Sequence, residues 1–277
     1  MRRFASLAAV SARELASIDG AITPTADAVL PLPDDGLYRG DGVFEVVRLY
    51  GGRPFALDAH LDRLERSASA IDLPLDREGF ERELGPLLAE HGTADAQLRV
   101  IATRGERRIL LIEPLAPRAE SITVATVTYQ PTVILNRVKS LSYGANMQAT
   151  RIAQQRGADE AVLVTPEGTV LEPPTATIFW AGADGILKTP SLENPILDSI
   201  TRDRIVGAVE VAEGTFDVAD LLGADEAFLA SSTKEVQPIA GIDGRELRWP
   251  GPRTAEAGQA FARVIESELG MTAGEPA

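Results

Sequence analysis

The amino-acid sequence contains no cysteine and only two histidines, His60 and His91. A chain without cysteine forms no disulfide, offers no thiolate nucleophile and holds no cysteine-based zinc site. Two histidines are too few for a histidine-rich metal site, so we expect no metal centre. The chemistry of this protein must therefore come from other side chains.

Lysine is also scarce, because only Lys139, Lys188 and Lys234 are present beside 24 arginines. A reactive amine therefore has few possible positions in this chain. Lys139 opens a stretch that closes with the carboxylate of Glu172, and a helix and a strand pair are expected between them. We interpret Lys139 as a catalytic amine and Glu172 as its electronic partner, joined by a bound cofactor.

The chain is acidic and lacks long apolar runs. Its formal net charge is −14 and its pI is near 4.7, which argues against a nucleic-acid partner that would need a basic face. A small anion can still bind in a locally positive pocket. No apolar run approaches the roughly 20 residues of a membrane span. The start, MRRFASLAAVSARELAS, has too brief an apolar run for a signal peptide, so we expect a cytoplasmic protein.

Hydrophobic patterning predicts helices and strands in the first half of the chain. Residues 19–42 are rich in Asp, Gly and Pro, which predicts irregular structure. Residues 42–55 alternate around Gly51-Gly52 and predict a hairpin. Helices are expected over 57–71 and 78–92, followed by a hairpin over 97–115. The two faces of the first strand are predicted to carry Val43, Glu45, Val47 and Leu49 on one side, and Phe44, Val46, Arg48 and Tyr50 on the other.

A segment rich in proline and polar residues separates this half from the next. It predicts two domains, residues 1–116 and 122–277, with a linker at 117–121. Beyond it we expect strands over 121–129, 175–182, 185–190 and 226–230, and a hairpin over 161–172. Helices are expected over 145–156, 199–214, 217–225 and 254–269, with a polar turn over 231–239. No GxGxxG or Walker-type loop is present, so dinucleotide and P-loop sites are disfavoured.

The order of several short motifs resembles one known family. The pieces are YRGDGVFEVVRLYGGRPFALDAHLDRLERSA, KSLSY, GADEAVLVTPEGTVLE, TIFW, SITRDRI and EAFLASSTKEVQPI. Together they resemble the class IV aminotransferases, the fold-type IV pyridoxal-phosphate enzymes. This group includes D-amino-acid and branched-chain aminotransferases, (R)-amine transaminases and aminodeoxychorismate lyase. The resemblance covers residues 34–244 and rests on six pieces in the right order.

The resemblance implies a fold, a cofactor and roles for single residues. It implies an α+β architecture with a small N-terminal α/β-sandwich domain, a larger C-terminal β-barrel-like domain, pyridoxal 5′-phosphate between them, and a homodimer. Lys139 matches the lysine that holds the cofactor as a Schiff base, and Glu172 matches the glutamate at the pyridine nitrogen. The residues that match the phosphate-binding set are Arg63, Ile200, Thr201 and Ser232, and Tyr143 is a candidate partner of the ring oxygen.

The substrate side of the site departs from the family pattern. The segment Val43-Phe44-Glu45-Val46 resembles the D-amino-acid and lyase branch, whereas branched-chain enzymes carry VFEG. An Arg-x-His carboxylate clamp is missing, and Ser199, Pro173-Pro174 and Thr177 replace the usual residues near the cofactor. The residues expected to bind substrate are Phe44, Val46, Arg48, Arg104, Arg107, Thr175 and Thr233, with Arg108 as a further carboxylate partner. Four arginines lie close together near the expected turn, namely Arg99, Arg104, Arg107 and Arg108, and they are candidates for binding a carboxylate. A solvated turn is the alternative interpretation of this arginine cluster.

These observations favour a transaminase that acts on D-amino acids, with (R)-primary amines as further substrates, and a 2-keto acid as acceptor. One alternative is aminodeoxychorismate lyase, which expels pyruvate by β-elimination and needs no second keto acid. Another is a branched-chain L-amino-acid aminotransferase. A protein that binds the cofactor without catalysis is disfavoured because Lys139, Glu172 and Arg63 are all present.

Overall fold

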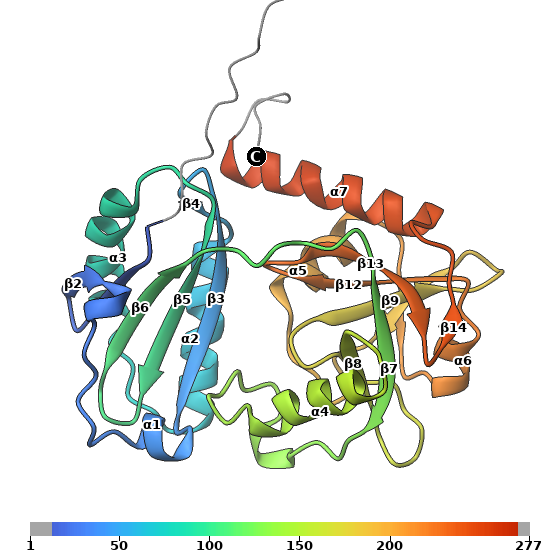
Figure 1. The fold of residues 1–277 in the computed structure, drawn as a ribbon, viewed down its shortest axis with the longest axis horizontal. Helices are drawn as coiled ribbons and strands as arrows, with labels where there is room; N and C mark the ends of the chain where they lie inside the picture. The colour runs from blue at the N-terminus through green and yellow to red at the C-terminus, as the bar shows by residue number, and fades with distance from the viewer. Residues whose placement is uncertain (1–12, 271–277) are drawn as a thin grey trace, which may run out of the picture.

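The structure is a computed structural model, which describes residues 13–270. Most of the N-terminal stretch that was assessed for a signal peptide lies outside these residues. The described chain forms two sheets covered by helices, as Figure 1 shows, and residues 114–121 join the sheets without forming a helix or strand. The predicted linker at 117–121 lies within this connection. None of the helices between residues 13 and 270 is long and apolar enough to span a membrane.

The N-terminal sheet has six strands in the order β2-β1-β6-β5-β3-β4, and all the pairings are antiparallel. Its strands are β1 (Leu15–Ile18), β2 (Ala21–Pro24), β3 (Gly42–Tyr50), β4 (Arg53–Pro54), β5 (Ala96–Thr103) and β6 (Arg108–Glu113). Its helices are η1 (Thr25–Asp27), α1 (Asp35–Arg39), α2 (Leu57–Ala70) and α3 (Arg77–His91).

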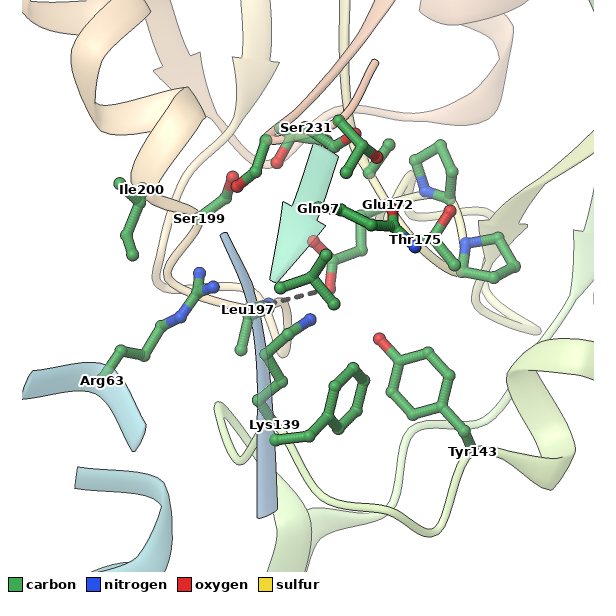
Figure 2. Close-up of a pocket in the computed structure, with 18 of the residues that line it drawn as sticks. Arg63, Gln97, Lys139, Tyr143, Glu172, Thr175, Leu197, Ser199, Ile200 and Ser231 are labelled. Atoms are coloured by element: carbon green, nitrogen blue, oxygen red, sulfur yellow. Dashed lines mark hydrogen bonds between the residues drawn. The ribbon is translucent and has the colours of Figure 1, made fainter. Parts of the chain in front are cut away.

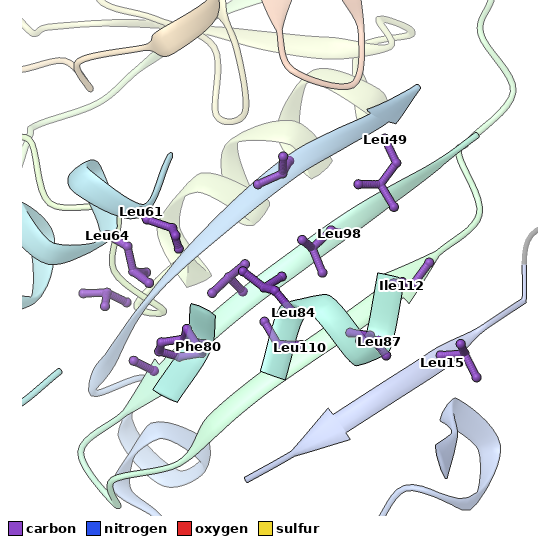
Figure 3. Packing of buried hydrophobic residues seen from close by; sticks show 14 of the residues in the cluster. Leu15, Leu49, Leu61, Leu64, Phe80, Leu84, Leu87, Leu98, Leu110 and Ile112 are labelled. Carbon is purple, nitrogen blue, oxygen red and sulfur yellow. The ribbon is translucent and has the colours of Figure 1, made fainter. Parts of the chain in front are cut away.

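Helices α2 and α3 cover one face of this sheet, and the core of the domain lies between the helices and the sheet (Figure 3). Leu61 and Leu64 of α2 are buried against strand residues such as Val47, because they recur at helical spacing on one side of the helix. The other face of β3 carries Phe44 and Val46, which face the second sheet. The alternation predicted for β3 is confirmed.

The tight β3–β4 turn depends on two glycines. Gly51 and Gly52 have φ angles of 55° and 76°, the left-handed region that glycine adopts without strain. A Cβ atom at Gly52 would also lie only 1.9 Å from the carbonyl oxygen of Gly92. The turn therefore sets the register of β3, the strand that carries Phe44 and Val46 to the site.

The C-terminal sheet has eight strands and curls around its own core (Figure 1). Seven follow the order β11-β10-β9-β12-β13-β7-β8, and β14 pairs with β13. The strands are β7 (Ile122–Thr128), β8 (Glu160–Val164), β9 (Thr177–Ala181), β10 (Leu187–Pro190), β11 (Ala212–Gly214), β12 (Glu226–Ser231), β13 (Glu235–Ile242) and β14 (Arg245–Glu246). The remaining helices are η2 (Val133–Leu135), α4 (Gly144–Gln155), α5 (Ile200–Ala208), α6 (Val218–Leu222) and α7 (Pro252–Leu269).

Aromatic packing joins the two domains. Phe55 of the small domain lies in the same buried cluster as Phe261 of α7, with an edge-to-face ring contact at 5.8 Å. The hydroxyl of Tyr50 donates a hydrogen bond of 2.9 Å to Glu235 at the start of β13. These contacts fix the large domain against the sheet face that carries Phe44 and Val46, so the gap between the domains has a defined shape.

Several sequence-based expectations need correction. Residues 19–42 are not irregular throughout, because they contain β2, η1 and α1, elements too short to show a hydrophobic period. The helix from Ser199 ends at Ala208, and residues 212–214 form β11 instead. The expected second strand of the 161–172 hairpin is reduced to two isolated bridges, from Val170 to Val164 and from Thr169 to Asp217, although backbone hydrogen bonds such as that from Leu171 to Leu163 still join the two segments. Residues 231–239 are not all turn, because β13 begins at Glu235.

Candidate active site

Lys139 is fixed by backbone contacts with the small domain. Its carbonyl oxygen accepts a hydrogen bond of 3.0 Å from the amide of Phe44, and its own amide donates one of 3.1 Å to the Ser67 hydroxyl. A β-bridge between Val43 and Ser140 continues this pairing. The irregular segment that carries Lys139 thus becomes a short extension of the N-terminal sheet, and the side chain points into the space between the domains (Figure 2).

The environment of the Lys139 amine favours its neutral form. Its Nζ lies 4.5 Å from the centre of the Phe44 ring and 5.8 Å from that of Tyr143. Burial lowers the pKa of Lys139 to about 8, and the guanidinium of Arg63 acts in the same direction. The carboxylates of Glu45 and Glu172 oppose this shift only in part. The amine can therefore lose its proton near neutral pH, as a nucleophile that attacks a carbonyl carbon must.

Glu172 lies on the opposite wall of the same space. One of its carboxylate oxygens accepts a hydrogen bond of 2.8 Å from the amide of Leu197, which fixes the direction of the group. Burial raises the pKa of Glu172 to about 7, although the Leu197 N–H and the cations Lys139 and Arg63 pull it down. A carboxyl group with this pKa can share a proton with a basic ring nitrogen placed beside it.

Positive potential gathers at the end of the space bounded by Arg63 and the start of α5. The N-terminal turn of α5 lies here, with Ser199 as the N-cap, whose hydroxyl accepts a hydrogen bond of 3.3 Å from the Arg202 amide. A helix N-terminus presents N–H groups that lack intrahelical partners, so it favours an anion. Arg63 reaches this end from α2 (Figure 2), and it donates a hydrogen bond of 2.7 Å to the carbonyl of Asp198.

A buried network supports this anion site from behind. Glu45 accepts hydrogen bonds of 2.7 Å from Nε and from Nη2 of Arg63, and His60 Nδ1 lies 2.7 Å from the same carboxylate. The Nε2 atom of His60 lies 3.4 Å from the Ser232 hydroxyl. Arg63 holds the pKa of Glu45 at about 2 despite full burial, with a further contribution from His60. Glu45 therefore stays ionised and holds the guanidinium in place.

These groups line one cavity of about 370 Å³ between the domains. Ten residues predicted for the site lie in its wall: Phe44, Val46, Arg63, Lys139, Tyr143, Glu172, Thr175, Ile200, Ser232 and Thr233. Thr201 is buried in the first turn of α5 but is not part of the wall. Arg99 of the arginine cluster and Ser199, which was expected near the cofactor, also lie in the wall. Residues in the wall without a predicted role include Gln97, Met147, Leu197 and Ser231.

The arginines proposed as carboxylate partners lie elsewhere, which corrects the sequence-based assignment. None of Arg48, Arg104, Arg107 and Arg108 lines the cavity. Each is neutralised by an acidic residue distant in sequence, in the pairs Arg48–Asp95 (2.7 Å), Arg104–Asp41 (3.1 Å), Arg107–Asp19 (2.7 Å) and Arg108–Glu83 (2.7 Å). The placement of these side chains in the described chain does not support a role in this cavity.

Arg99 is the arginine of the cluster that does reach the cavity. It lies on β5 directly opposite Val46 of β3, and directly opposite residues of an antiparallel pair share one face of the sheet. Its Nε donates a hydrogen bond of 3.0 Å to Glu113, and its side chain is 31% exposed. The same register places Gln97 on this face. Once β3 and β5 are known to pair, the alternation of side chains along β5 predicts that Arg99 and Gln97 face the cavity.

Comparisons with known proteins agree with this geometry. The family model described as amino-transferase class IV matches residues 42–242, which is most of the chain. The chain belongs to the class IV aminotransferase family. The matched span includes Lys139, Glu172 and the anion end of the cavity.

Relatives in this family carry different activities. The chain is 35% identical to a Methanocaldococcus jannaschii protein named as a branched-chain-amino-acid aminotransferase, over 83% of this chain and 88% of that protein. It is 34% identical to the D-alanine aminotransferase of Listeria monocytogenes (88% and 93% covered) and 29% identical to the aminodeoxychorismate lyase of Bacillus subtilis (91% and 94% covered).

Solved structures of fold-type IV enzymes share the architecture. A fold IV transaminase of Curtobacterium pusillum superposes with a TM-score of 0.82 at 26% identity, covering 91% of this chain and 100% of that one. The pyridoxal-phosphate-bound form of a Mycobacterium tuberculosis hypothetical aminotransferase gives a TM-score of 0.83 at 26% identity, covering 92% and 99%. The predicted fold class, family and cofactor are confirmed.

The cavity residues fit pyridoxal 5′-phosphate. The Lys139 amine, with its lowered pKa, suits the carbonyl group of the cofactor. The fixed carboxylate of Glu172 suits the ring nitrogen, and the N-terminus of α5 beside Arg63 suits the phosphate. Thr177 also lines the cavity, and its buried hydroxyl has no hydrogen-bond partner within residues 13–270.

Proposed function

We propose that this protein is an aminotransferase that moves an amino group between a D-amino acid and a 2-keto acid, with (R)-primary amines as further donors. The observation that carries the proposal is the position of Arg99 in the cavity that holds Lys139 and Glu172. The Nε of Arg99 is paired with Glu113, so the proposal uses the other N–H groups of its guanidinium, which offer a substrate carboxylate a partner besides the anion end at Arg63. The D-alanine aminotransferase relatives and Val46 in the cavity wall support the D-amino-acid branch.

The positions of the residues support their proposed roles. Arg63, Ile200 and Ser232 would hold the cofactor phosphate, with Thr201 behind them in the first turn of α5. The bound cofactor would supply an electron sink for charge that develops at the substrate α-carbon. Glu172 would keep the ring nitrogen protonated. Lys139 would hold the carbonyl end of the cofactor, and its free amine would accept the proton from the substrate α-carbon as a general base.

Phe44, Val46, Thr175 and Thr233 form the remaining substrate wall in this proposal, and Tyr143 borders the ring. Tyr143 contacts Phe44 edge to face with ring centres 5.2 Å apart. Burial raises the pKa of the Tyr143 hydroxyl, so it stays protonated and can donate a hydrogen bond. Its place beside Lys139 suits the ring oxygen of the cofactor.

A single-turnover experiment tests the proposal. The purified yellow protein is mixed with D-alanine, L-alanine, L-leucine or (R)-1-phenylethylamine without a keto acid, and absorbance follows conversion to the aminated cofactor. We expect rapid conversion with D-alanine, and return of the original spectrum when 2-oxoglutarate is added. Conversion with L-leucine but not D-alanine would contradict the D-amino-acid assignment and favour the branched-chain alternative suggested by the 35% identical relative.

The aminodeoxychorismate lyase alternative is supported by the Bacillus subtilis relative. A lyase uses the same proton removal at the α-carbon but then expels a leaving group. Incubation with aminodeoxychorismate separates the two reactions. Release of pyruvate and 4-aminobenzoate, with no stable aminated cofactor from any D-amino acid, would show that the transaminase proposal is wrong.

We also propose that the protein works in the cytoplasm as a homodimer. Large apolar side chains remain exposed near the site-bearing segments of the described chain, including Val29, Leu32, Val133 and Ile134, each at least 67% exposed. Exposed apolar side chains of this kind are typical of a surface that a second subunit covers. Sedimentation velocity at micromolar concentration should give about twice the mass of the 29.5 kDa chain, and a monomer would contradict the proposal.

A further inference from the structure

Lys234 lies outside the catalytic groups but contacts two segments of the cavity wall. It belongs to the turn between β12 and β13 that also carries Ser232, and its amide donates a hydrogen bond of 3.2 Å to the Ser231 hydroxyl. Its Nζ lies 3.2 Å from a carboxylate oxygen of Glu160 and 3.4 Å from the hydroxyl of Thr175. One side chain therefore joins this turn to β8 and to the loop after Glu172.

The ion pair with Glu160 is well anchored. Glu160 is 8% exposed. Its other carboxylate oxygen accepts hydrogen bonds of 2.6 Å from the Thr150 hydroxyl and 3.1 Å from the Ala161 amide. These partners hold the carboxylate in one orientation, so the Lys234 amine is drawn to a fixed point. Loss of the amine would leave a buried charge without its cation, a costly arrangement.

The loop that Lys234 reaches has few bonds of its own. Pro173 and Pro174 have no N–H groups, so this part of the cavity wall donates fewer backbone hydrogen bonds than an ordinary loop. The carbonyl of Pro174 accepts a long hydrogen bond of 3.4 Å from Asn146, and the Ala176 amide lies 3.5 Å from the carbonyl of Pro173. Figure 2 shows Thr175 close to Glu172, and both prolines line the same cavity. The position of this wall therefore depends on contacts from outside the loop.

We propose that Lys234 is a positioning residue that ties the Pro173–Thr175 wall to the turn carrying Ser232, and so controls how long the cofactor is retained. It acts through Thr175 and Glu160 and does not touch the cofactor. The Pro173–Thr175 wall lines the cavity next to Glu172, and the turn lines it through Ser231, Ser232 and Thr233. In this proposal a single ammonium group sets the spacing between these two parts of the cofactor site. The proposal rests on the cofactor assignment and is independent of the choice of substrate.

Of the two lysines other than Lys139, Lys188 serves as the matched control for Lys234. Lys188 also forms a partly buried ion pair, with its Nζ 2.9 Å from Asp220, but it lies outside the cavity wall. The experiment uses Lys234→Met, Lys234→Arg and Lys188→Met, each loaded with pyridoxal 5′-phosphate and then diluted into an excess of apo protein of another pyridoxal-phosphate enzyme that reports uptake. The rate of cofactor loss is compared with the midpoint of thermal unfolding of each apo protein.

We expect Lys234→Met to lose cofactor at least tenfold faster than the wild type, with a raised KM for both substrates and a smaller change in kcat. Lys188→Met should lose cofactor at the wild-type rate even where its unfolding midpoint falls. Lys234→Arg should recover most of the retention because it restores the charge. Thr175→Val, which removes the hydroxyl but not the ion pair, should give a smaller increase in the rate.

The proposal is overturned if Lys234→Met retains cofactor as the wild type does, or if Lys188→Met accelerates the loss to the same extent. If Lys234→Met does not fold, Thr175→Val and the charge-removing Glu160→Gln take its place. A wild-type release rate in both of these variants also overturns the proposal. Cofactor that never binds the wild-type protein would instead refute the cofactor assignment, a result distinct from unchanged release.

Discussion

The guanidinium of Arg63 and the carboxylate of Glu45 form a bidentate pair with two hydrogen bonds of 2.7 Å, and Glu45 is fully buried. Arg63 comes from α2 and Glu45 from the side of β3 that faces this helix, whereas Phe44 and Val46 on the other side of β3 line the cavity. One strand therefore contributes to the proposed substrate wall with one face and supports the proposed phosphate site with the other.

Replacement of Glu45 by glutamine should destabilise the protein and weaken cofactor binding. Removing one charge of a buried pair typically costs about 3–5 kcal/mol, because the remaining charge is left without compensation. Urea unfolding of the apo protein measures this loss. Glu81→Gln is the control, because Glu81 pairs with Arg77 at the surface, where such pairs contribute roughly 0–1 kcal/mol. Equal effects of both variants would contradict the importance of the buried pair.

Cofactor uptake by the apo protein should depend on the protonation of Lys139. Since burial and Arg63 lower the pKa of this amine to about 8, its reactive neutral form is the minor form at lower pH. The rate of uptake should rise about tenfold per pH unit below this value and level off above it. Stopped-flow absorbance between pH 6 and 10 measures the profile, with Lys188→Met as control. A profile that still rises through pH 10 would contradict the lowered pKa.

Glu172 should make the stability of the apo protein depend on pH. Burial raises its pKa from 4.5 to about 7, so between these values the folded chain binds more protons than the unfolded chain. This contribution to stability is present at pH 4.5 and is lost as the pH rises through 7. Urea unfolding of the wild type and Glu172→Gln across this range should show a steeper fall for the wild type. Parallel curves would be evidence against the raised pKa.

Substitution of Arg99 should change substrate affinity more than cofactor binding. Loss of a charge-assisted hydrogen bond costs about 1.5–3 kcal/mol, which corresponds to roughly a ten- to hundredfold increase in KM. Arg99→Gln should therefore raise KM for D-alanine or 2-oxoglutarate while the spectrum of the bound cofactor stays unchanged. Arg104→Gln is the matched control, because Arg104 pairs with Asp41 away from the cavity. An unchanged KM in Arg99→Gln would remove the proposed carboxylate partner.

Local signals in the sequence were sufficient for much of the fold. The Gly51-Gly52 turn, the apolar spacing of α2 and the capping residue Ser199 each depend on neighbours within a few residues, and each appears in the structure. Strand pairing between residues far apart in the sequence cannot be predicted from such local signals. Residues 231–239 were predicted as a polar turn, whereas β13 begins at Glu235 and includes Pro238. Because β13 pairs with β7 only from Ile239, the missing N–H of the proline costs no bond there.

The site shows the same division. Lys139, Glu172 and Arg63 followed from ordered motifs, and the structure brings all three to one cavity. The four neighbouring arginines could not be separated by sequence, because their acidic partners, such as Asp19 for Arg107 and Asp41 for Arg104, are distant along the chain. Only the pairing of β3 with β5 distinguishes Arg99, by placing it opposite Val46.

The most direct test of the central claim is the visible absorption of Lys139→Ala. A lysine bonded to pyridoxal 5′-phosphate absorbs at about 410–420 nm. The purified wild type and Lys188→Ala should both show this band after loading with cofactor, and Lys139→Ala should lack it. Persistence of the band in Lys139→Ala, or its absence from the loaded wild type, would contradict the assignment of Lys139 as the catalytic amine.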